Sequence, residues 1–201
     1  MKRHTRSALG FTLIELLVAM AVVAMLAAIT LAAIRGAMDK SREAQSAQQT
    51  RQIIAALLAR AADQNTFYSN SEVGFSSYRS TDDSLGLPKL LEKGGYLSAE
   101  KVWWVPGSRA ALAKYNNSFC WNRSDSVCGK PLASMEKPST ISVLWSNYCY
   151  TLPSVKEVPE PSSTGGPRTP SSAYYQYPFR GGTSAHFAYA DGHVDMQVLK
   201  K

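Results

Sequence analysis

A long apolar segment near the amino terminus constrains this chain more than any other feature. It runs from Phe11 to Ile34 and exceeds the roughly 20 residues that a helix needs to cross the hydrocarbon core of a membrane. A short basic stretch, residues 1–10 (MKRHTRSALG), precedes it. Because basic flanks tend to stay in the cytoplasm, the pattern predicts a single-pass anchor with a short cytoplasmic amino terminus and the remaining chain outside.

One acidic residue, Glu15, interrupts this segment near its cytoplasmic end. An ionised side chain in the apolar core of a membrane costs a few kcal/mol, and a simple signal anchor gives no reason to carry one. A cleaved secretory peptide would have a shorter apolar stretch and a small-x-small exit. Glu15 therefore indicates a segment that does more than hold the chain in lipid, and its carboxylate needs a compensating cation.

The segment from Gly10 to Leu26, GFTLIELLVAMAVVAML, resembles the leader junction of type IV pilins and type II secretion pseudopilins. The resemblance implies that a prepilin peptidase cleaves between Gly10 and Phe11 and methylates the new amino group of Phe11. It also implies that Glu15 pairs with the terminal amine of a neighbouring subunit. The implied location is the bacterial inner membrane and then a periplasmic or surface filament. The implied partners are prepilin peptidase, like subunits in a filament, an inner-membrane assembly platform and membrane lipid.

Helical character continues beyond the apolar segment. Residues 35–63 contain no proline and are rich in Ala, Gln, Arg and Leu, which favour helix. An apolar stripe recurs there at helical spacing, at Ile53, Ile54, Leu57, Leu58 and Ala61. We therefore predict one helix from Phe11 to about Asp63, with its second half packed on a sheet.

The predicted fold class is α+β and pilin-like, with a long amino-terminal helix packed on a small antiparallel sheet that includes a carboxy-terminal hairpin. The expected divisions are a leader (1–10), a transmembrane or filament-core helix (11–34), a periplasmic helix half (35–63) and a globular domain (64–201) with a flexible loop near 153–172. Within the globular domain we expect a short helix at Pro88–Tyr96, ended by Gly94 and Gly95, and strands at 101–106, 118–121 and 140–145.

The last segment, His186–Val198, predicts a β-hairpin with Asp191 and Gly192 as a two-residue turn. That turn would place four apolar side chains on one face, in the opposed pairs Tyr189–Val194 and Phe187–Met196. The surrounding sequence, GGTSAHFAYADGHV, resembles the carboxy-terminal processing-associated motif of many prepilin-like proteins, described as His, nine residues, then Asp-Gly. Gly181 stands where that motif has its histidine, so a role that depends on the histidine does not carry over.

Two further groups of residues are candidate sites. Asp191, His193 and Asp195 alternate along the hairpin and carry ligand atoms for calcium, but hard cations require more converging oxygens, so we expect no metal or other cofactor. Cys120 and Cys128 are close enough in sequence to close a short disulfide loop in an exported domain, leaving Cys149 unpaired. The alternative is that all three are reduced side chains in the core.

Charge and composition exclude other classes of function. The net charge of +7 is not gathered into a dense basic patch with aromatic residues, so no nucleic acid is expected as the primary ligand. No nucleophile, base and orienting group stand together, so we expect no enzyme. The leading hypothesis is a structural subunit of a type II secretion pseudopilus or type IV pilus-like filament. The alternative is a minor or tip subunit, or a membrane-anchored adhesin, whose aromatic residues bind sugar or protein unless they pack in the core.

Overall fold

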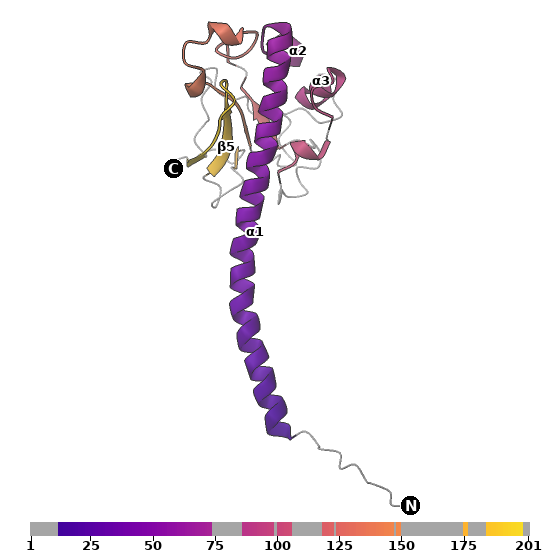
Figure 1. Ribbon diagram of the computed structural model, residues 1–201, viewed down its shortest axis with the longest axis vertical. Coiled ribbons are helices and arrows are strands. Elements are labelled where there is room, and N and C mark those ends of the chain that lie inside the picture. Colours follow the sequence, from indigo (N-terminus) through magenta and orange to yellow (C-terminus); the bar gives the residue numbers. More distant parts are fainter. Residues whose placement is uncertain are drawn as a thin grey trace, which may run out of the picture. The chain divides into compact units, whose positions relative to one another are not determined.

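The computed structural model describes residues 12–73, 86–98, 100–105, 118–122, 124–146, 148–149, 175–176 and 184–198. The chain divides into two compact units, Met1–Ser41 and Arg42–Lys201, and helix α1 contributes residues to both (Figure 1). With η denoting a 3-10 helix, the elements in chain order are α1 (Leu13–Gln64), α2 (Asn70–Val73), α3 (Leu87–Lys93), η1 (Glu100–Trp103), β1 (Phe119–Trp121), η3 (Leu132–Ser134), η4 (Pro138–Thr140), β2 (Ser142–Ser146), β3 (Tyr148–Cys149), β4 (Tyr175–Gln176), β5 (Ser184–Tyr189) and β6 (Val194–Val198).

Helix α1 has 52 residues and confirms the helix predicted from Phe11 to about Asp63. It ends where Asn65 adopts a left-handed conformation with φ of 59°, a common way to stop helical hydrogen bonding. Within the second unit one face of the helix is buried. The apolar stripe on that face, which we define as Ile53, Ile54, Leu57 and Ala61, is at most 2% exposed.

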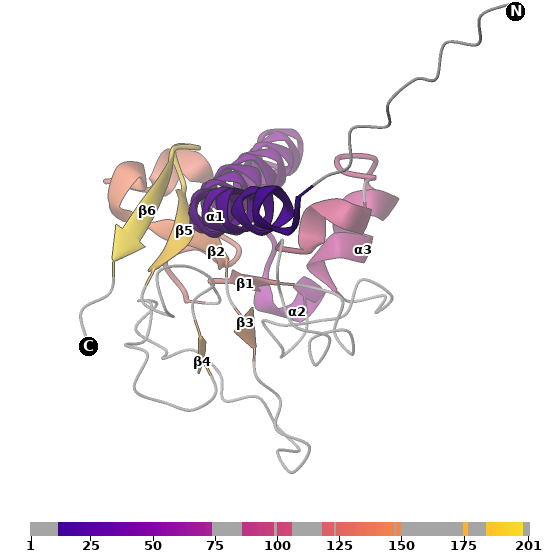
Figure 2. The ribbon, with the colours of Figure 1, turned by 90° about the horizontal axis from the view of Figure 1, so that it is seen from below.

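Four strands form an antiparallel sheet in the order β1-β2-β5-β6, and β3 pairs with β4 separately. In the second unit the buried face of α1 packs on the four-stranded sheet (Figure 2). The long helix, small antiparallel sheet and carboxy-terminal hairpin confirm the predicted α+β fold. The strands predicted at 118–121 and 140–145 are present as β1 and β2, and α3 ends at Gly94 and Gly95 as expected. The loop predicted near 153–172 lies outside the described residues.

Large aromatic side chains fill the interior of the second unit. Trp103, Trp121 and Trp145 are at most 3% exposed. Trp121 meets Phe67 with ring centroids 6.1 Å apart, and Trp103 meets Phe119 edge to face at 6.2 Å, an arrangement that stabilises a core beyond area burial alone. These three tryptophans therefore pack in the core, which was one of the two roles predicted for the aromatic residues.

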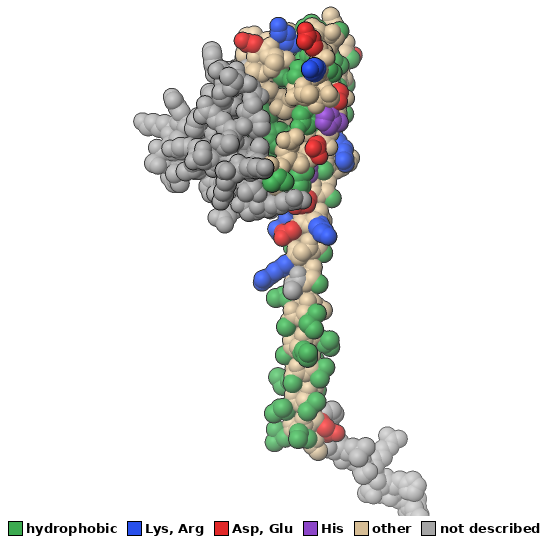
Figure 3. Space-filling model, turned by 90° about the vertical axis from the view of Figure 1, so that its left-hand side faces the viewer, with side chains coloured by type: hydrophobic (Ala, Val, Ile, Leu, Met, Phe, Trp, Pro, Cys, Tyr) green, Lys and Arg blue, Asp and Glu red, His purple; other side chains and the backbone are tan. Residues whose placement is uncertain are grey.

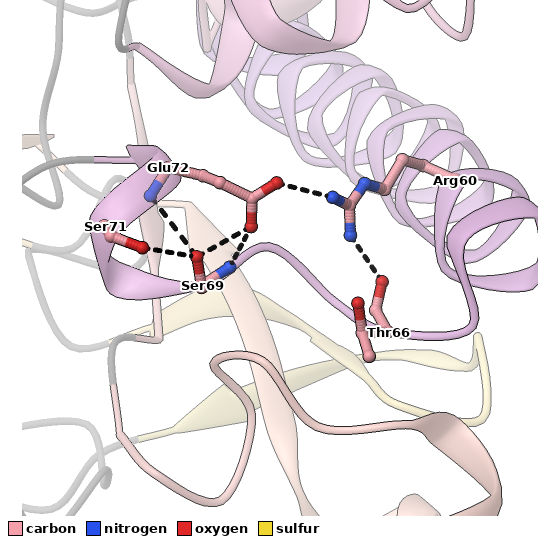
Figure 4. A network of polar contacts seen from close by, with 5 residues as sticks. All are labelled: Arg60, Thr66, Ser69, Ser71 and Glu72. Carbon is pink, nitrogen blue, oxygen red and sulfur yellow. Dashed lines mark hydrogen bonds and ion pairs between the residues drawn. The ribbon is translucent and has the colours of Figure 1, made fainter.

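Arg60, near the end of α1, fixes the connection that follows the helix (Figure 4). Its guanidinium donates to Oε1 of Glu72 at 2.7 Å and to the carbonyl of Thr66, and it lies 4.0 Å from the ring centroid of Tyr68. The backbone N–H of Ser69 donates to the other carboxylate oxygen of Glu72 at 2.7 Å. Burial opposes ionisation of Glu72, but the hydrogen bonds from Ser69 and the charge of Arg60 outweigh it and hold the pKa of this carboxyl below its usual value.

The prediction of a strand at 101–106 was wrong, because the chain forms the 3-10 helix η1 at Glu100–Trp103. The backbone carbonyls around it bond to groups other than a neighbouring strand. The carbonyl of Trp103 accepts from the N–H of Ser118 at 2.7 Å, and the carbonyl of Trp104 accepts from Nε2 of Gln49 at 2.9 Å. The aromatic and β-branched composition of this segment therefore serves core packing, since Val102, Trp103 and Val105 are all buried.

The hairpin exists, but its predicted register was wrong by one residue. Tyr189 pairs with His193 through a hydrogen bond from the Tyr189 N–H to the His193 carbonyl at 3.0 Å, so the loop contains three residues, Ala190, Asp191 and Gly192. The shift places Phe187 opposite Asp195, Ala188 opposite Val194 and His186 opposite Met196. Because successive side chains alternate between faces, Phe187 and Tyr189 lie on the face opposite to Val194 and Met196, which pack on the core.

Candidate processing and assembly site

Helix α1 begins with a reciprocal pair of hydrogen bonds between Thr12 and Glu15. Oε2 of Glu15 accepts from the backbone N–H of Thr12 at 2.9 Å and from its hydroxyl at 2.8 Å. In return, Oγ1 of Thr12 accepts from the N–H of Glu15 at 3.3 Å. This is a capping box, in which residues three apart satisfy each other's unpaired donors at the start of a helix. The predicted cleavage site at Gly10 and Phe11 lies outside the described residues.

The first unit exposes a continuous apolar surface along α1, which we call the apolar surface and define as the large apolar side chains from Leu13 to Ile34. Each of them is at least 53% exposed. In Figure 3 they appear as green side chains along the exposed part of α1. By length and composition α1 is able to cross a membrane, and its apolar part is not buried within the chain. An apolar surface of this extent marks contact with lipid or with another protein.

The single hydroxyl in the middle of this surface is satisfied inside the helix. Oγ1 of Thr30 donates to the carbonyls of Leu26 and Ala27, 3.0 Å away in each case. A polar group bonded in this way does not require water, so Thr30 is compatible with lipid or a helix bundle. Glu15 is the one acidic group on the described part of the apolar surface, and the apolar surface ends where charged residues begin at Arg35.

The hairpin residues considered as metal ligands bond to one another and to their own backbone. Oδ1 of Asp191 lies 2.6 Å from Nδ1 of His193 and accepts from the His193 N–H at 3.1 Å. Burial raises the pKa of Asp191, but these hydrogen bonds prevail and hold the pKa of its carboxyl below the usual value. Oδ1 of Asp195 accepts from the N–H of Met196 at 2.8 Å. Among the residues that the structure describes, no three or more His, Cys, Asp or Glu side chains are grouped to hold a metal ion.

Beside the hairpin lies an open groove of about 460 Å³, whose lining includes Thr140, Ser142, Tyr189, His193, Asp195 and Gln197. The rings of Tyr189 and His193 stack at 4.2 Å with only 4° between their planes. Nε2 of Gln197 donates to the hydroxyl of Tyr189 at 2.7 Å, which fixes the orientation of that ring. The groove therefore presents a stacked aromatic pair of fixed orientation, beside the carboxylate of Asp195 and the hydroxyls of Thr140 and Ser142.

In the structure Cys120 and Cys128 are not bonded to each other. Sγ of Cys128 lies 3.4 Å from Nε1 of Trp121 and 3.4 Å from the carbonyl oxygen of Asn122. Cys120 precedes Trp121 in strand β1, so the two side chains leave the strand on opposite faces. Cys128 contacts the side chain of Trp121 and is thereby kept on the face away from Cys120.

Sequence reasoning located Glu15 but missed its partner Thr12. The signal was present, because Thr-x-x-Glu directly before an apolar helical run is typical of a capping box. It also missed His186, whose Nδ1 lies 3.2 Å from Oγ of Ser46 in the interior. No local sequence pattern predicts this pair, because Ser46 and His186 are 140 residues apart in the sequence.

Comparison with known proteins agrees with the geometry of the amino terminus. Residues 5–31 match the family described as the prokaryotic N-terminal methylation motif, the signature of type IV pilins and pseudopilins. The match includes Gly10, Phe11 and Glu15. The motif implies processing by prepilin peptidase and assembly with pilin-like subunits, and its family is structural rather than catalytic. No curated protein and no solved structure matches the chain.

Proposed function

We propose that this chain is a prepilin-like structural subunit that assembles into a type II secretion pseudopilus or a type IV pilus-like filament. Prepilin peptidase cleaves it between Gly10 and Phe11 and methylates the amino group of Phe11. The observation that carries the proposal is the coincidence of the methylation motif at residues 5–31 with an apolar helix surface that this chain does not itself cover.

The chemistry of the helix supports two successive environments for the apolar surface. Before assembly the segment 11–34 spans the inner membrane, with the leader 1–10 in the cytoplasm and residues 35–201 in the periplasm. After assembly on the inner-membrane platform, the same surface is covered by α1 helices of neighbouring subunits. Both environments are apolar on all sides, which suits a helix that is apolar all round.

Glu15 then acts as the acceptor for a cation supplied by another subunit. A carboxylate in a helix bundle needs an opposite charge and hydrogen bonds, because its desolvation is otherwise uncompensated. Cleavage after Gly10 creates an amine at Phe11, four residues before Glu15 in sequence. In the single chain the carboxylate is held by Thr12 at 2.8–2.9 Å, so it is already ordered when a neighbouring amine arrives.

The test is the identity of the mature amino terminus. The full chain is expressed in cells that hold an active prepilin peptidase and, as the control, in cells whose peptidase is inactivated. Mass spectrometry of the intact membrane-extracted protein is expected to show a chain that begins at N-methyl-Phe11 in the first cells and at Met1 in the second. An uncut Met1 terminus in the presence of the active peptidase would contradict the proposal.

A second candidate role is a minor or tip subunit, or an anchored adhesin, and the groove beside the hairpin favours it. An aromatic pair next to Asp195 and hydroxyls suits contact with sugar or protein. The number of copies in purified filaments separates the two roles. Many copies per filament support the structural subunit, and about one copy supports the tip role.

A further inference from the structure

The open groove described above lies on the face of the carboxy-terminal hairpin that does not pack on α1. Phe187 and Tyr189 of β5 contribute to its lining, together with His193, Asp195 and Gln197 from the second arm of the hairpin. The register places all five side chains on this face, because Phe187 pairs with Asp195 and Tyr189 with His193. Because β6 is an edge strand of the four-stranded sheet (Figure 2), this groove, which we call the hairpin groove, lies at the edge of the sheet.

Most polar atoms of the hairpin groove are hydrogen-bond acceptors. Oδ1 of Asp195 accepts from the N–H of the next residue at 2.8 Å, and Oδ2 has no hydrogen-bond partner within the described chain. Nε2 of Gln197 donates to the hydroxyl of Tyr189 at 2.7 Å, which leaves the side-chain carbonyl of Gln197 as an acceptor. Oγ1 of Thr140 donates to the carbonyl of Lys137 at 2.9 Å, so its lone pairs remain available. This inventory favours a ligand that is rich in donors.

The hairpin groove carries negative charge. Asp195 is the one carboxylate among the lining residues that the structure describes, and none of those residues is a lysine or an arginine. The charge of Asp195 also acts on the aromatic pair: burial, followed by this charge, raises the pKa of the Tyr189 hydroxyl, and the hydrogen bond from Gln197 opposes the shift. A proton on the ring of His193 is matched by Asp191, whose Oδ1 lies 2.6 Å from Nδ1 of His193. The charge of Asp195 therefore favours a cationic ligand over a neutral one.

The stacked rings of Tyr189 and His193 offer a platform for a planar cation. Tyr189 covers one face of the imidazole at 4.2 Å, and the side chain of His193 is 45% exposed, so its other face is accessible. Asp195 follows two residues later on the same face of the strand, which places the carboxylate beside the platform. A guanidinium is planar, has five N–H donors and no acceptor, and stacks on aromatic rings, whereas an ammonium group is a compact point charge. The platform therefore suits arginine better than lysine.

We propose that the hairpin groove binds an arginine side chain presented by a partner protein. The guanidinium donates to Oδ2 of Asp195 and lies against the accessible face of His193, while the oxygen atoms of Gln197 and Thr140 accept its remaining N–H groups. The inference rests on the second role proposed above, in which the groove contacts another molecule, and it identifies that molecule as a protein rather than a sugar. The mature amino terminus and the number of copies per filament test the filament roles separately, so either proposal can fail without the other.

Titration of the full chain in detergent micelles with short capped peptides tests the proposal. The peptide Gly-Arg-Gly, added up to about 10 mM because a single side chain in an open groove binds weakly, is expected to shift the amide NMR signals of His193, Asp195 and Gln197 saturably. Citrulline has nearly the shape of arginine without its charge, and its peptide is expected to bind at least about tenfold more weakly. The lysine peptide, which lacks the planar fork, is expected to bind at least about threefold more weakly.

Three results of this titration would overturn the proposal. The first is the absence of a saturable shift with the arginine peptide, and the second is equal binding of the arginine and citrulline peptides. The third comes from a parallel titration with the methyl glycosides of glucose and galactose. If either sugar saturates the same signals more tightly than the arginine peptide does, the hairpin groove is a sugar site.

Two matched variants separate the proposed ion pair from the general charge of the protein. Asp195→Asn keeps the shape of the side chain and the acceptor for the N–H of Met196, and it is expected to weaken binding of the arginine peptide at least about fivefold. Asp125→Asn makes the same change at an exposed carboxylate that does not line the groove, and binding is expected to stay within about twofold. Unchanged binding in Asp195→Asn, or an equal loss in both variants, contradicts the assignment. If Asp195→Asn does not fold, the comparison of the arginine and citrulline peptides on the wild-type chain decides the outcome.

Discussion

The large apolar side chains of α1 between Leu13 and Ile34 are at least 53% exposed, whereas Ile53, Ile54 and Leu57 in the same helix are at most 1% exposed. The two regions differ both in composition and in arrangement. The first is apolar on every side of the helix, and the second has an apolar stripe with exposed polar residues such as Arg51 and Gln52 beside it. A stripe needs cover on one side, which the sheet of this chain supplies, but a helix that is apolar all round needs cover on every side. The first region therefore depends on lipid or other subunits.

The largest expected effect contrasts one leucine from each region. Leu57→Ala removes a side chain that is fully buried, and we expect it to lower the free energy of unfolding of the second unit by about 2–5 kcal/mol. Leu17→Ala is the matched control, because Leu17 is 66% exposed in the single chain, and we expect a change within about 0.5 kcal/mol. Urea unfolding followed by tryptophan fluorescence in micelles measures both. Similar losses in the two variants would show that the regions do not differ in the way described.

A second prediction concerns what covers the exposed region. Glu15→Ala is expected to leave cleavage after Gly10 intact and to reduce filament yield at least about tenfold, since the acceptor for a neighbouring cation is lost. Electron microscopy and quantification of sheared filaments measure the yield, and the mass of the mature chain reports cleavage. The control is Glu15→Gln, which keeps a side chain able to form the capping box but carries no charge. Normal assembly of Glu15→Gln would assign Glu15 a capping role only.

Local patterns in the sequence were sufficient for the parts of the fold that depend on neighbours along the chain. The helix, strands β1 and β2, and the glycine end of α3 follow from period, composition and capping residues. Segment 101–106 was predicted wrongly because aromatic and β-branched residues favour both a strand and a buried 3-10 turn. The 3-10 turn is favoured by two groups that are distant in sequence. The N–H of Ser118 and the side chain of Gln49 donate to the carbonyls of Trp103 and Trp104, which a neighbouring strand would otherwise use.

The candidate site was predictable to the same extent and for the same reason. Gly10, Phe11 and Glu15 form a local motif, and their significance is readable from their order alone. The burial of Ser46 and Thr50 was not predictable, because both residues suit a solvated helix face as well as a buried one until the sheet, with His186 next to Ser46, is placed. The register of the hairpin was also misjudged, since Asp-Gly fits a two-residue turn and also the last two positions of a three-residue loop.

A prediction with a smaller effect on unfolding than Leu57→Ala tests that three-residue loop where it approaches α1. Gly192 has φ of +92°, and a Cβ added there would lie 3.0 Å from Cδ1 of Leu58, so Gly192→Ala combines an unfavourable backbone conformation with a close contact on the buried side of the helix. We expect it to lower the free energy of unfolding of the second unit by about 1–2 kcal/mol. Gly36→Ala is the control from the exposed part of α1, where an added Cβ meets nothing within 4 Å. Alanine favours helix over glycine, so this control is expected to leave unfolding unchanged or to stabilise the helix slightly. The same urea titration measures both variants, and an unaltered Gly192→Ala protein would contradict the contact between the hairpin loop and α1.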